Sequence, residues 1–574
     1  MIRGKRSPEA VVTGSKGNSV ASARRRQAAT GAVVHAWRVL LSRGPSQAQF
    51  WFIALALGIA SGLGAVAFRA AISGAQALFY GTDDIRTLHS FARTLPWYVI
   101  FIIPVLGGLV VGLILSRMTP DGRVRSVADV IEGAALHKGR LEQRAGYAST
   151  LASLVTLSTG GSTGREGPVV HLAGQISAWV SRRINADGIT GRDLLGCSVA
   201  AAVSASFNAP IAGAIFAMEV VLRHFAVHAF APIVIASVAG TVVARLWFGD
   251  VTEFELTEQT ALAFYVELPA FLMLGLVCGV VSVVLMKAVF FTTELGDRYT
   301  SRTRLAQTVR PMLSGAVLGA IAIWFPHIIG VGYETTSAAL TGRIPLVEAI
   351  AMAAIKVVAV AVTMGGRMGG GMFSPSLMVG ALTGLAFGAI ATEVFPEVSG
   401  AATLYALAGM GAVAAAVLGA PISTTLIVFE LTGDWQAGIA VMVSVSLAVA
   451  VSTRLVEHSF FLTQLAQRGV RLAAGPDYLL DLQSVGVVMR SIDSPRAAPE
   501  AACRALIEEG VTLSPSNNLT DAMEIFDEAG HAFVPVVAQS KEAGPPELLG
   551  AIFHLDAVRA HNRAIAERIR EEHT

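Results

Sequence analysis

Residues 164–168 read Gly164-Arg165-Glu166-Gly167-Pro168, and residues 371–375 read Gly371-Met372-Phe373-Ser374-Pro375. Each stretch stands directly before an apolar segment. Glycine lets a backbone come close to a neighbour or a ligand, and proline is at home in the first turn of a helix. Each stretch is therefore predicted to be a tight turn that ends in an exposed helix N-terminus.

A second pair of motifs follows the first pair in the same order. Phe207-Asn208-Ala209-Pro210-Ile211-Ala212-Gly213 runs on to Glu219, and Leu418-Gly419-Ala420-Pro421-Ile422-Ser423 runs on to Glu430 with the same spacing from proline to glutamate. Chance similarity between Ala- and Gly-rich helices is the alternative, but the shared order weighs against it. The chain is therefore predicted to contain two repeats, roughly 96–247 and 309–456. In transporters, such repeats often have opposite topology, and their corresponding loops meet near the bilayer midplane.

The composition indicates a membrane protein. Of the 574 residues, 53% are hydrophobic and only 15% are charged, and the mean hydropathy is +0.60. Six apolar blocks are close to the roughly 20 residues that span a bilayer: Phe50–Phe68, Trp97–Leu115, Ala231–Leu246, Leu268–Phe290, Val347–Met364 and Ile439–Leu455. Shorter apolar blocks, such as 152–157 and 412–417, are bounded by Gly, Pro or small polar residues. The sequence thus predicts an all-α polytopic membrane protein with two inverted repeats and many short, tilted, broken helices.

Exposed helix N-termini suggest what such a protein would bind. Their free N–H groups and the positive end of the helix dipole attract anions. Two facing N-termini would hold a small anion without a buried lysine, and conduction needs binding that the ion can escape. We expect the substrate to be a small anion.

The N-terminal region and the cysteines are less informative about function. Residues 1–47 contain nine Lys and Arg residues against the single Glu9, which predicts a cytoplasmic basic tail, and no cleavable signal peptide is recognisable in it. The net charge of +2 gives no reason to expect a nucleic-acid partner. The three cysteines have no metal-binding or disulfide spacing and are expected to be structural. No cofactor is expected.

Residues 48–470 resemble the chloride channel/transporter family. Of the family's three anion-site signatures, Gly-Arg-Glu-Gly-Pro is present at 164–168 and Gly-x-Phe-x-Pro at 371–375. The third, Gly-Ser-Gly-Ile-Pro, is reduced to Arg125-Ser126-Val127-Ala128-Asp129, in which only the serine is kept. The resemblance implies a homodimer in a lipid bilayer, with one chloride pathway per subunit.

The resemblance also implies roles for single residues. Glu166 would be the gating glutamate, whose carboxylate competes with the anion and swings away on protonation; a helix-capping role is the alternative. A carboxylate within a membrane segment is functional by default. The backbone of Met372 and Phe373 and the Ser126 hydroxyl would contact a central anion, and a serine there accompanies chloride rather than nitrate in this family. The expected anion-binding residues are Ser126, Arg165, Gly167, Met372, Phe373, Ser374 and Phe461.

Two departures from the family pattern bear on mechanism. Phe461 replaces the family's central tyrosine, and Val220 stands where many proton-coupled members have an internal glutamate. Because valine cannot carry a proton, these residues favour a passive chloride channel, and a chloride/proton antiporter is the alternative. Arg125 is either a charge that draws anions in or a plain interfacial arginine. Arg367 has no assigned role.

The last part of the chain, 471–574, changes to a mixed composition. We expect a linker at Gly475-Pro476, an amphipathic helix at Asn518–Ala529, strands at 532–537 and 548–553, and a closing helix from Asp556. This small α/β region resembles a partial cytoplasmic CBS module. Adenosine-binding members usually have Ser or Thr where this chain has Phe553, so a bracing role is favoured over binding of an adenine nucleotide.

Other functions fit less well. A CBS-bearing Mg²⁺ channel is a more remote alternative, because Gly-rich helix starts repel cations. A membrane protease or another enzyme is not expected, since no His-Glu-x-x-His motif is found. The tail and the overall composition favour a bacterial inner membrane, with both termini in the cytoplasm.

Overall fold

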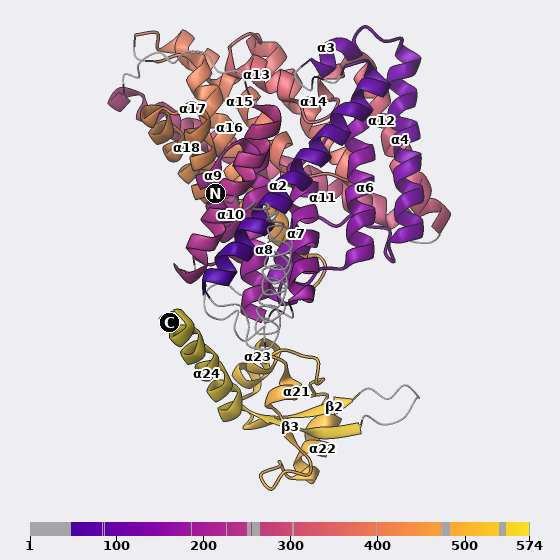
Figure 1. Cartoon of the computed structure of the whole chain (residues 1–574), viewed down its shortest axis with the longest axis vertical. Helices are drawn as coiled ribbons and strands as arrows, with labels where there is room; N and C mark the ends of the chain where they lie inside the picture. Colours follow the sequence, from indigo (N-terminus) through magenta and orange to yellow (C-terminus); the bar gives the residue numbers. More distant parts are fainter. Residues whose placement is uncertain are drawn as a thin grey trace, which may run out of the picture.

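The computed structural model consists of a large helical body with a small α/β unit at one end (Figure 1). It describes residues 47–572 apart from short stretches, of which the longest are 255–263, 473–482 and 539–546. Within the described residues, eight helices are long and apolar enough to cross a membrane. The predicted basic tail up to residue 46 and the linker at Gly475-Pro476 lie outside the described residues.

Two inverted repeats make up most of the helical body. The first contains α4 (Trp97–Met118), α5 (Val127–Ala135), α6 (Gln143–Ser158), α7 (Glu166–Arg183), α8 (Gly188–Phe207), α9 (Pro210–Phe216), the π-helix η1 (Ala217–Leu222) and α10 (Val227–Phe248). The second contains α12 (Arg304–Trp324), the 3₁₀ turn η2 (Pro326–Ile328), α13 (Tyr333–Leu340), α14 (Leu346–Gly365), α15 (Phe373–Val394), α16 (Ala402–Leu418), α17 (Pro421–Thr432) and α18 (Trp435–Leu455). Outside the repeats lie α2 (Gln47–Tyr80), α3 (Leu88–Ala92), α11 (Phe264–Thr300) and α19 (Phe460–Ala466).

The second motif pair explains how long apolar segments become broken helices. Asn208 follows α8 and Gly419 follows α16, both with left-handed backbone, at φ of 58° and 69°. Asparagine and glycine tolerate this conformation better than other residues. Pro210 and Pro421 then begin α9 and α17, where the N–H that proline lacks would have no helical partner. The same turn therefore recurs at the same place in both repeats.

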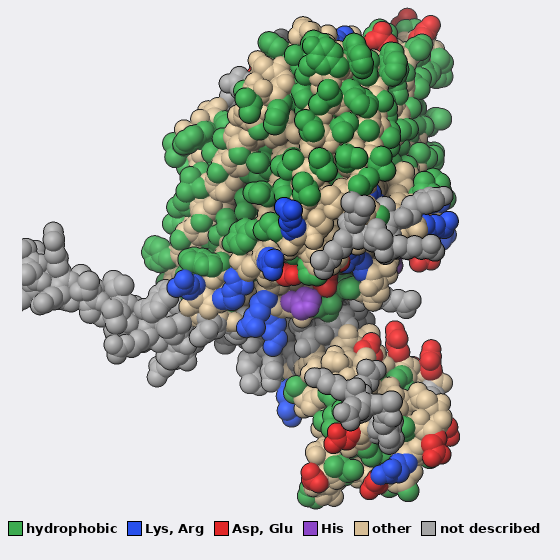
Figure 2. Space-filling view, turned by 90° about the vertical axis from the view of Figure 1, so that its right-hand side faces the viewer, with side chains coloured by type: hydrophobic (Ala, Val, Ile, Leu, Met, Phe, Trp, Pro, Cys, Tyr) green, Lys and Arg blue, Asp and Glu red, His purple; other side chains and the backbone are tan. Residues whose placement is uncertain are grey.

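The outer face of the helical body is apolar. Figure 2 shows hydrophobic side chains over most of it, with Lys and Arg gathered toward the end that faces the α/β unit. Exposed apolar residues include Trp97, Leu106, Leu272, Met273 and Val347. Soluble monomers rarely expose apolar patches of this extent. The predicted all-α polytopic membrane fold is therefore confirmed.

All six predicted apolar blocks lie inside helices. The sequence prediction missed α12 and α15 as spans, because their mean hydropathies of 1.2 and 1.7 are the lowest of the eight candidates. Helix α12 also contains Arg304 and Arg310. Arg310 is buried, and its guanidinium donates to the Gly365 carbonyl. A helix that satisfies its arginine against a neighbouring helix needs less hydropathy than a lipid-facing one.

The C-terminal unit is a three-stranded antiparallel sheet with strand order β1-β3-β2, packed with helices. Its elements are α21 (Val485–Val488), β1 (Arg490–Ser491), α22 (Glu500–Glu508), α23 (Leu519–Ala529), β2 (Phe533–Ala538), β3 (Glu547–Phe553) and α24 (His554–Glu572). Leu519, Ala522 and Phe526 of α23 are buried against the sheet, as their spacing predicts. The closing helix begins at His554, two residues before the predicted start. The identification of this unit as CBS-like stays a prediction.

Candidate functional site

The two glycine motifs contact each other directly. The Gly164 N–H donates to the Gly371 carbonyl, and the Gly371 N–H donates to the Gly164 carbonyl, both at 2.8 Å. The Thr163 hydroxyl donates to the same Gly371 carbonyl at 3.0 Å. A Cβ atom on Gly371 would lie 2.8 Å from the Gly167 nitrogen, closer than real contacts allow. The motifs need glycine because the two backbones touch.

Two helix N-termini therefore meet at this pair of loops. Helix α7 begins at Glu166 and α15 at Phe373, and Pro168 and Pro375 lie in their first turns. First-turn N–H groups have no partner within their own helix, so those of Gly167 and Phe373 remain available for a ligand. The dipoles of both helices add positive potential at the same place. This arrangement can attract a small anion.

Glu166 lies beside these N-termini and is 1% exposed. Its Oε1 accepts a hydrogen bond from the Tyr333 hydroxyl at 2.9 Å and lies 3.9 Å from the Arg165 Nε. Arg165 is also buried, and its guanidinium donates to the Ser206 carbonyl at 3.4 Å and lies over the Tyr333 ring. The carboxylate thus occupies the place where the helix dipoles would favour an anion.

The other residues of the second loop are buried too. Met372 precedes α15, and Met372, Phe373 and Ser374 are at most 4% exposed. The Phe373 ring lies 4.6 Å from the Phe207 ring and 5.8 Å from the Phe216 ring, between centroids. The aromatic residue of one motif therefore packs against that of the second motif pair.

Ser126 lies apart from the paired loops, at the start of α5. Its hydroxyl donates to Gln464 Oε1 of α19 at 3.1 Å, and its N–H donates to Asp129 at 2.7 Å. Ser126 lines a cavity of about 170 Å³ that also reaches Gly370, the neighbour of Gly371. Phe461 of α19 is buried and its ring packs on the edge of Phe460, which lines that cavity. The cavity thus connects the serine region with the second glycine motif.

Val220 lies in η1 and is 5% exposed within the apolar core. The preceding Glu219 accepts hydrogen bonds from the N–H groups of Ile422 and Ser423, at 2.9 and 2.8 Å. Glu430 accepts equivalent bonds from Ile211 and Ala212, at 2.9 and 2.8 Å. Each glutamate therefore caps the helix that begins at the proline of the other repeat, which gives both a structural role.

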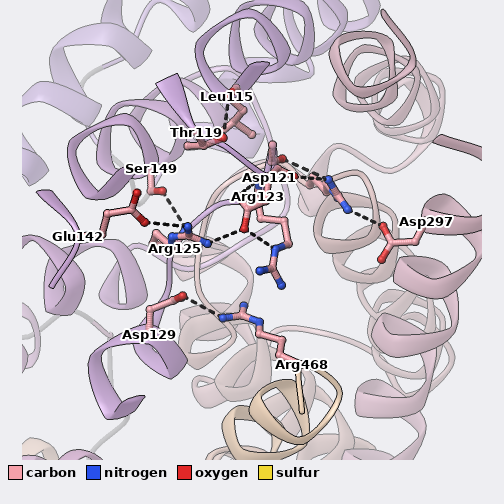
Figure 3. Close-up of polar contacts among 12 residues, drawn as sticks. Leu115, Thr119, Asp121, Arg123, Arg125, Asp129, Glu142, Ser149, Asp297 and Arg468 are labelled. Carbon is pink, nitrogen blue, oxygen red and sulfur yellow. Dashed lines mark hydrogen bonds and ion pairs between the residues drawn. The ribbon is translucent and has the colours of Figure 1, made fainter. Parts of the chain in front are cut away.

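A group of arginines lines the approach to the small cavity. The lining of the 170 Å³ cavity includes Arg123, Arg367 and Arg468. Two of these arginines, Arg123 and Arg468, also line a larger cavity of about 750 Å³. Figure 3 shows Asp121 between Arg123 and Arg125, and Asp129 opposite Arg468. Asp121 Oδ2 lies 2.8 Å from both the Arg123 Nε and the Arg125 Nη1, and Arg468 lies 2.9 Å from Asp129.

The structure shows what Arg125 and Arg367 contact, whereas the sequence alone does not indicate a clear role for either. Arg125 pairs with Asp121 and Glu142, and its N–H donates to Ser149. Arg367, at a left-handed φ of 58°, pairs with Asp297 at 2.9 Å and donates to the Asp121 carbonyl at 3.1 Å. Both side chains hold the segment between α4 and α5 in place.

The charge of Asp121 depends on these arginines. Burial acts to raise the pKa of Asp121, but hydrogen bonds and positive charge from Arg125 and Arg123 outweigh it and lower the pKa to about 2. Asp121 is therefore ionised at any physiological pH.

Sequence reasoning missed Tyr333, Gln464, Arg123 and Arg468 as part of this region. Tyr333 begins α13 directly after Gly332, and α13 corresponds in repeat order to α5, which Ser126 precedes. Extending the repeat comparison to that helix would place residues 332–333 opposite Ser126 and Val127. Gln464 and Arg468 carry no motif, and only the fold brings α19 onto α5.

A family model described as "Voltage gated chloride channel" matches residues 107–453. A "putative chloride channel protein ClcB-like" of Ralstonia nicotianae is 30% identical over 397 residues, which cover 68% of this chain and 91% of the relative.

Two solved structures share the fold. A slow cyanobacterial Cl⁻/H⁺ antiporter has a TM-score of 0.66 at 21% identity, covering 74% of this chain and 98% of the other. A CLC-type fluoride/proton antiporter has a TM-score of 0.60 at 17% identity, covering 72% and 96%. The small C-terminal unit lies beyond the residues that the family model matches.

Proposed function

The chain belongs to the voltage-gated chloride channel family and is a multi-pass anion transporter of the membrane, and from this premise we propose that it exchanges chloride for protons. The observation that carries the proposal is the Glu166 carboxylate, buried beside the N-termini of α7 and α15. The names of the two antiporters with the same fold agree with it.

The physics of the site links the two ions. An ionised carboxylate beside two positive helix ends competes with chloride for the same potential. Protonation removes its charge, so the side chain loses its attraction to this place and an anion replaces it. If Glu166 takes up a proton from one side before chloride passes and releases it to the other side before the carboxylate returns, the two movements are coupled.

The remaining residues would shape the anion pathway. In this proposal, the N–H groups of Met372, Phe373 and Ser374 and the hydroxyl of Ser126 contact a central chloride, with Phe461 beside it. The N–H of Gly167 and the charge of Arg165 favour an outer anion. The arginines around the 170 Å³ cavity raise the local concentration of chloride at its mouth.

A passive chloride channel is the second candidate. Val220 favours it, because this buried valine and its apolar surroundings offer no proton carrier at that position, and Phe461 lacks a hydroxyl. Exchange then requires that protons reach Glu166 by a path that does not use residue 220.

Glu166→Gln tests the proposal. Glutamine keeps the size but cannot ionise, so chloride flux in liposomes is expected to continue without proton movement and without a response to pH. Glu393→Gln, an exposed position on α15, is the matched control and should behave like the wild type. Unchanged coupling in Glu166→Gln would contradict the assignment.

The assembly and orientation are part of the same proposal. We infer a homodimer with one pathway per subunit, in a bacterial inner membrane, with both termini in the cytoplasm. The basic residues near the α/β unit (Figure 2) favour that orientation by the positive-inside rule. Light scattering of the purified protein should give a protein mass near twice 59.9 kDa, and a single-chain mass would contradict the dimer.

The C-terminal unit is proposed to brace the assembly. Asp556 pairs with Arg490 at 2.6 Å, and the Arg490 guanidinium stacks on the Phe553 ring at 4.1 Å. Because Asp556 and Phe553 are both engaged by Arg490, they are not open to an adenine nucleotide, which favours bracing over nucleotide binding.

A further inference from the structure

Tyr333 connects the second repeat to the Glu166 carboxylate. The two residues are 167 positions apart, and the Tyr333 hydroxyl donates to Glu166 Oε1 at 2.9 Å. Both side chains are buried, at 2% and 1% exposure. None of the motifs in the sequence includes Tyr333, yet it makes the hydrogen bond that holds this carboxylate.

The Tyr333 ring is held on several sides. The Phe254 ring lies 5.3 Å away between centroids, and the Arg165 guanidinium lies 5.0 Å from the ring centre. The preceding Gly332 has a φ of 95°, and a Cβ there would lie 2.4 Å from the Met378 sulfur. These contacts restrict the position of the Tyr333 ring, so that its hydroxyl stays directed at Glu166.

The segment before α13 is anchored by a buried lysine. Lys356 of α14 is 0% exposed, and its ammonium donates to the carbonyls of Gly330 and Ile328, at 3.0 and 3.3 Å. Its side chain thus ties down the turn from which Tyr333 projects.

Groups from three elements act on the surroundings of the carboxylate, and two of them are charged. Arg165, before α7, lies 3.9 Å from Oε1, and Lys356 of α14 acts through the backbone of the segment before Tyr333. The backbone nitrogen of Ser374, in α15, and Oε2 of Glu166 both lie close to Gly164. Among the described residues, Oε2 itself has no hydrogen-bond partner. The carboxylate is therefore held through Oε1.

We propose that Tyr333 is a positioning residue that holds the ionised Glu166 side chain in the anion pathway and must release it in every transport cycle. A phenol donates a stronger hydrogen bond to a carboxylate than to a neutral carboxylic acid. The contact therefore favours the blocking form and weakens when Glu166 takes up a proton. This proposal rests on the proposed function, because it assigns Tyr333 a part in the movement of Glu166.

Tyr333→Phe removes only the hydroxyl and keeps the ring packing. Hydrogen bonds to charged groups change an equilibrium by roughly tenfold or more when removed. We expect chloride flux in proteoliposomes at neutral pH to rise on the order of tenfold, and the rise of flux with acidity to begin at a higher pH. Chloride binding, measured by calorimetry, should tighten, because the competing carboxylate is held less firmly.

Two further variants separate this role from a structural one. In the Glu166→Ala background, Tyr333→Phe should change neither flux nor chloride binding, since the group that it holds is gone. Tyr80→Phe is the matched control: Tyr80 is 1% exposed, and among the described residues its hydroxyl has no hydrogen-bond partner. It should leave flux and its pH response unchanged.

The outcomes distinguish the two proposals. If Tyr333→Phe matches the wild type in flux, pH response and chloride affinity, or has the same effect in the Glu166→Ala background, the role of Tyr333 is refuted. If Glu166→Ala itself leaves flux and pH response unchanged, the proposed function fails, and the role of Tyr333 fails with it.

Discussion

Glu166 illustrates how one side chain depends on contacts that its motif does not contain. The Gly-Arg-Glu-Gly-Pro sequence supplies the helix start and the close approach of Gly167 to Gly371. The hydrogen bond to Oε1 comes from Tyr333 in the other repeat. The chemistry of this residue therefore depends on both repeats being assembled.

A single methyl group at the loop contact should disrupt it. In Gly371→Ala, the new Cβ would lie 2.8 Å from the Gly167 nitrogen and 3.0 Å from its Cα. Overpacking of this kind costs about 1–3 kcal/mol, so we expect a lower melting temperature in detergent and at least a severalfold loss of chloride flux. Gly74→Ala on α2, where a Cβ meets nothing within 4 Å, is the control. Equal melting temperatures for the two variants would argue against the tight loop contact.

The charge of Asp121 leads to a second prediction, which concerns stability at low pH. Its folded pKa of about 2 lies below the ordinary value of 3.8, so its contribution to stability is complete above pH 4 and is lost as the pH falls toward 2. Asp121→Asn should therefore melt at a lower temperature than the wild type at pH 7. The difference should shrink between pH 4 and pH 3, and a difference independent of pH would show that the charge of Asp121 is not the cause.

At the scale of elements, the crossed caps join the two repeats. Glu219 of η1 caps α17, and Glu430 of α17 caps α9, each with two backbone hydrogen bonds. A negative charge at a helix N-terminus also interacts favourably with its dipole. The broken helices therefore stabilise each other's starts, although each is too short to span a membrane alone.

Loss of either cap should have a similar cost. Glu219→Gln and Glu430→Gln each remove the charge and weaken two hydrogen bonds, and loss of an N-cap costs about 0.5–2 kcal/mol. We expect a lower melting temperature for both variants, measured by scanning fluorimetry in detergent. Glu393→Gln, at an exposed position in the last turn of α15 and away from any helix N-terminus, serves as the control. If both cap variants have the same melting temperature as this control, the crossed caps contribute nothing to stability.

At the scale of the whole molecule, the sequence predicted the architecture better than the contacts. Hydropathy located six apolar blocks, and the repeated Ala-Pro turns located the broken helices, because both depend on local physics. Helices α12 and α15 were missed because their hydropathy is the lowest of the eight candidates; α12 contains two arginines, of which Arg310 is satisfied by the Gly365 carbonyl.

The candidate site was only partly predictable, for a physical reason. Gly164, Glu166 and Gly371 stand in recognisable motifs, because backbone contact and helix starts restrict residue choice. Tyr333 and Gln464 make side-chain hydrogen bonds to residues 167 and 338 positions away in the chain, and such contacts leave no local pattern. The same holds for Arg367, which pairs with Asp297 of α11.

In the proposed mechanism, chloride and proton movements are coupled through Glu166. Proteoliposomes loaded with high chloride and placed in low chloride, with a dye that reports external pH, test it directly. We expect chloride efflux to drive protons inward against their gradient, so that the external pH rises. Glu166→Ala should abolish this rise while chloride still leaves. Chloride efflux without proton movement in the wild type would rule out exchange and identify a passive channel.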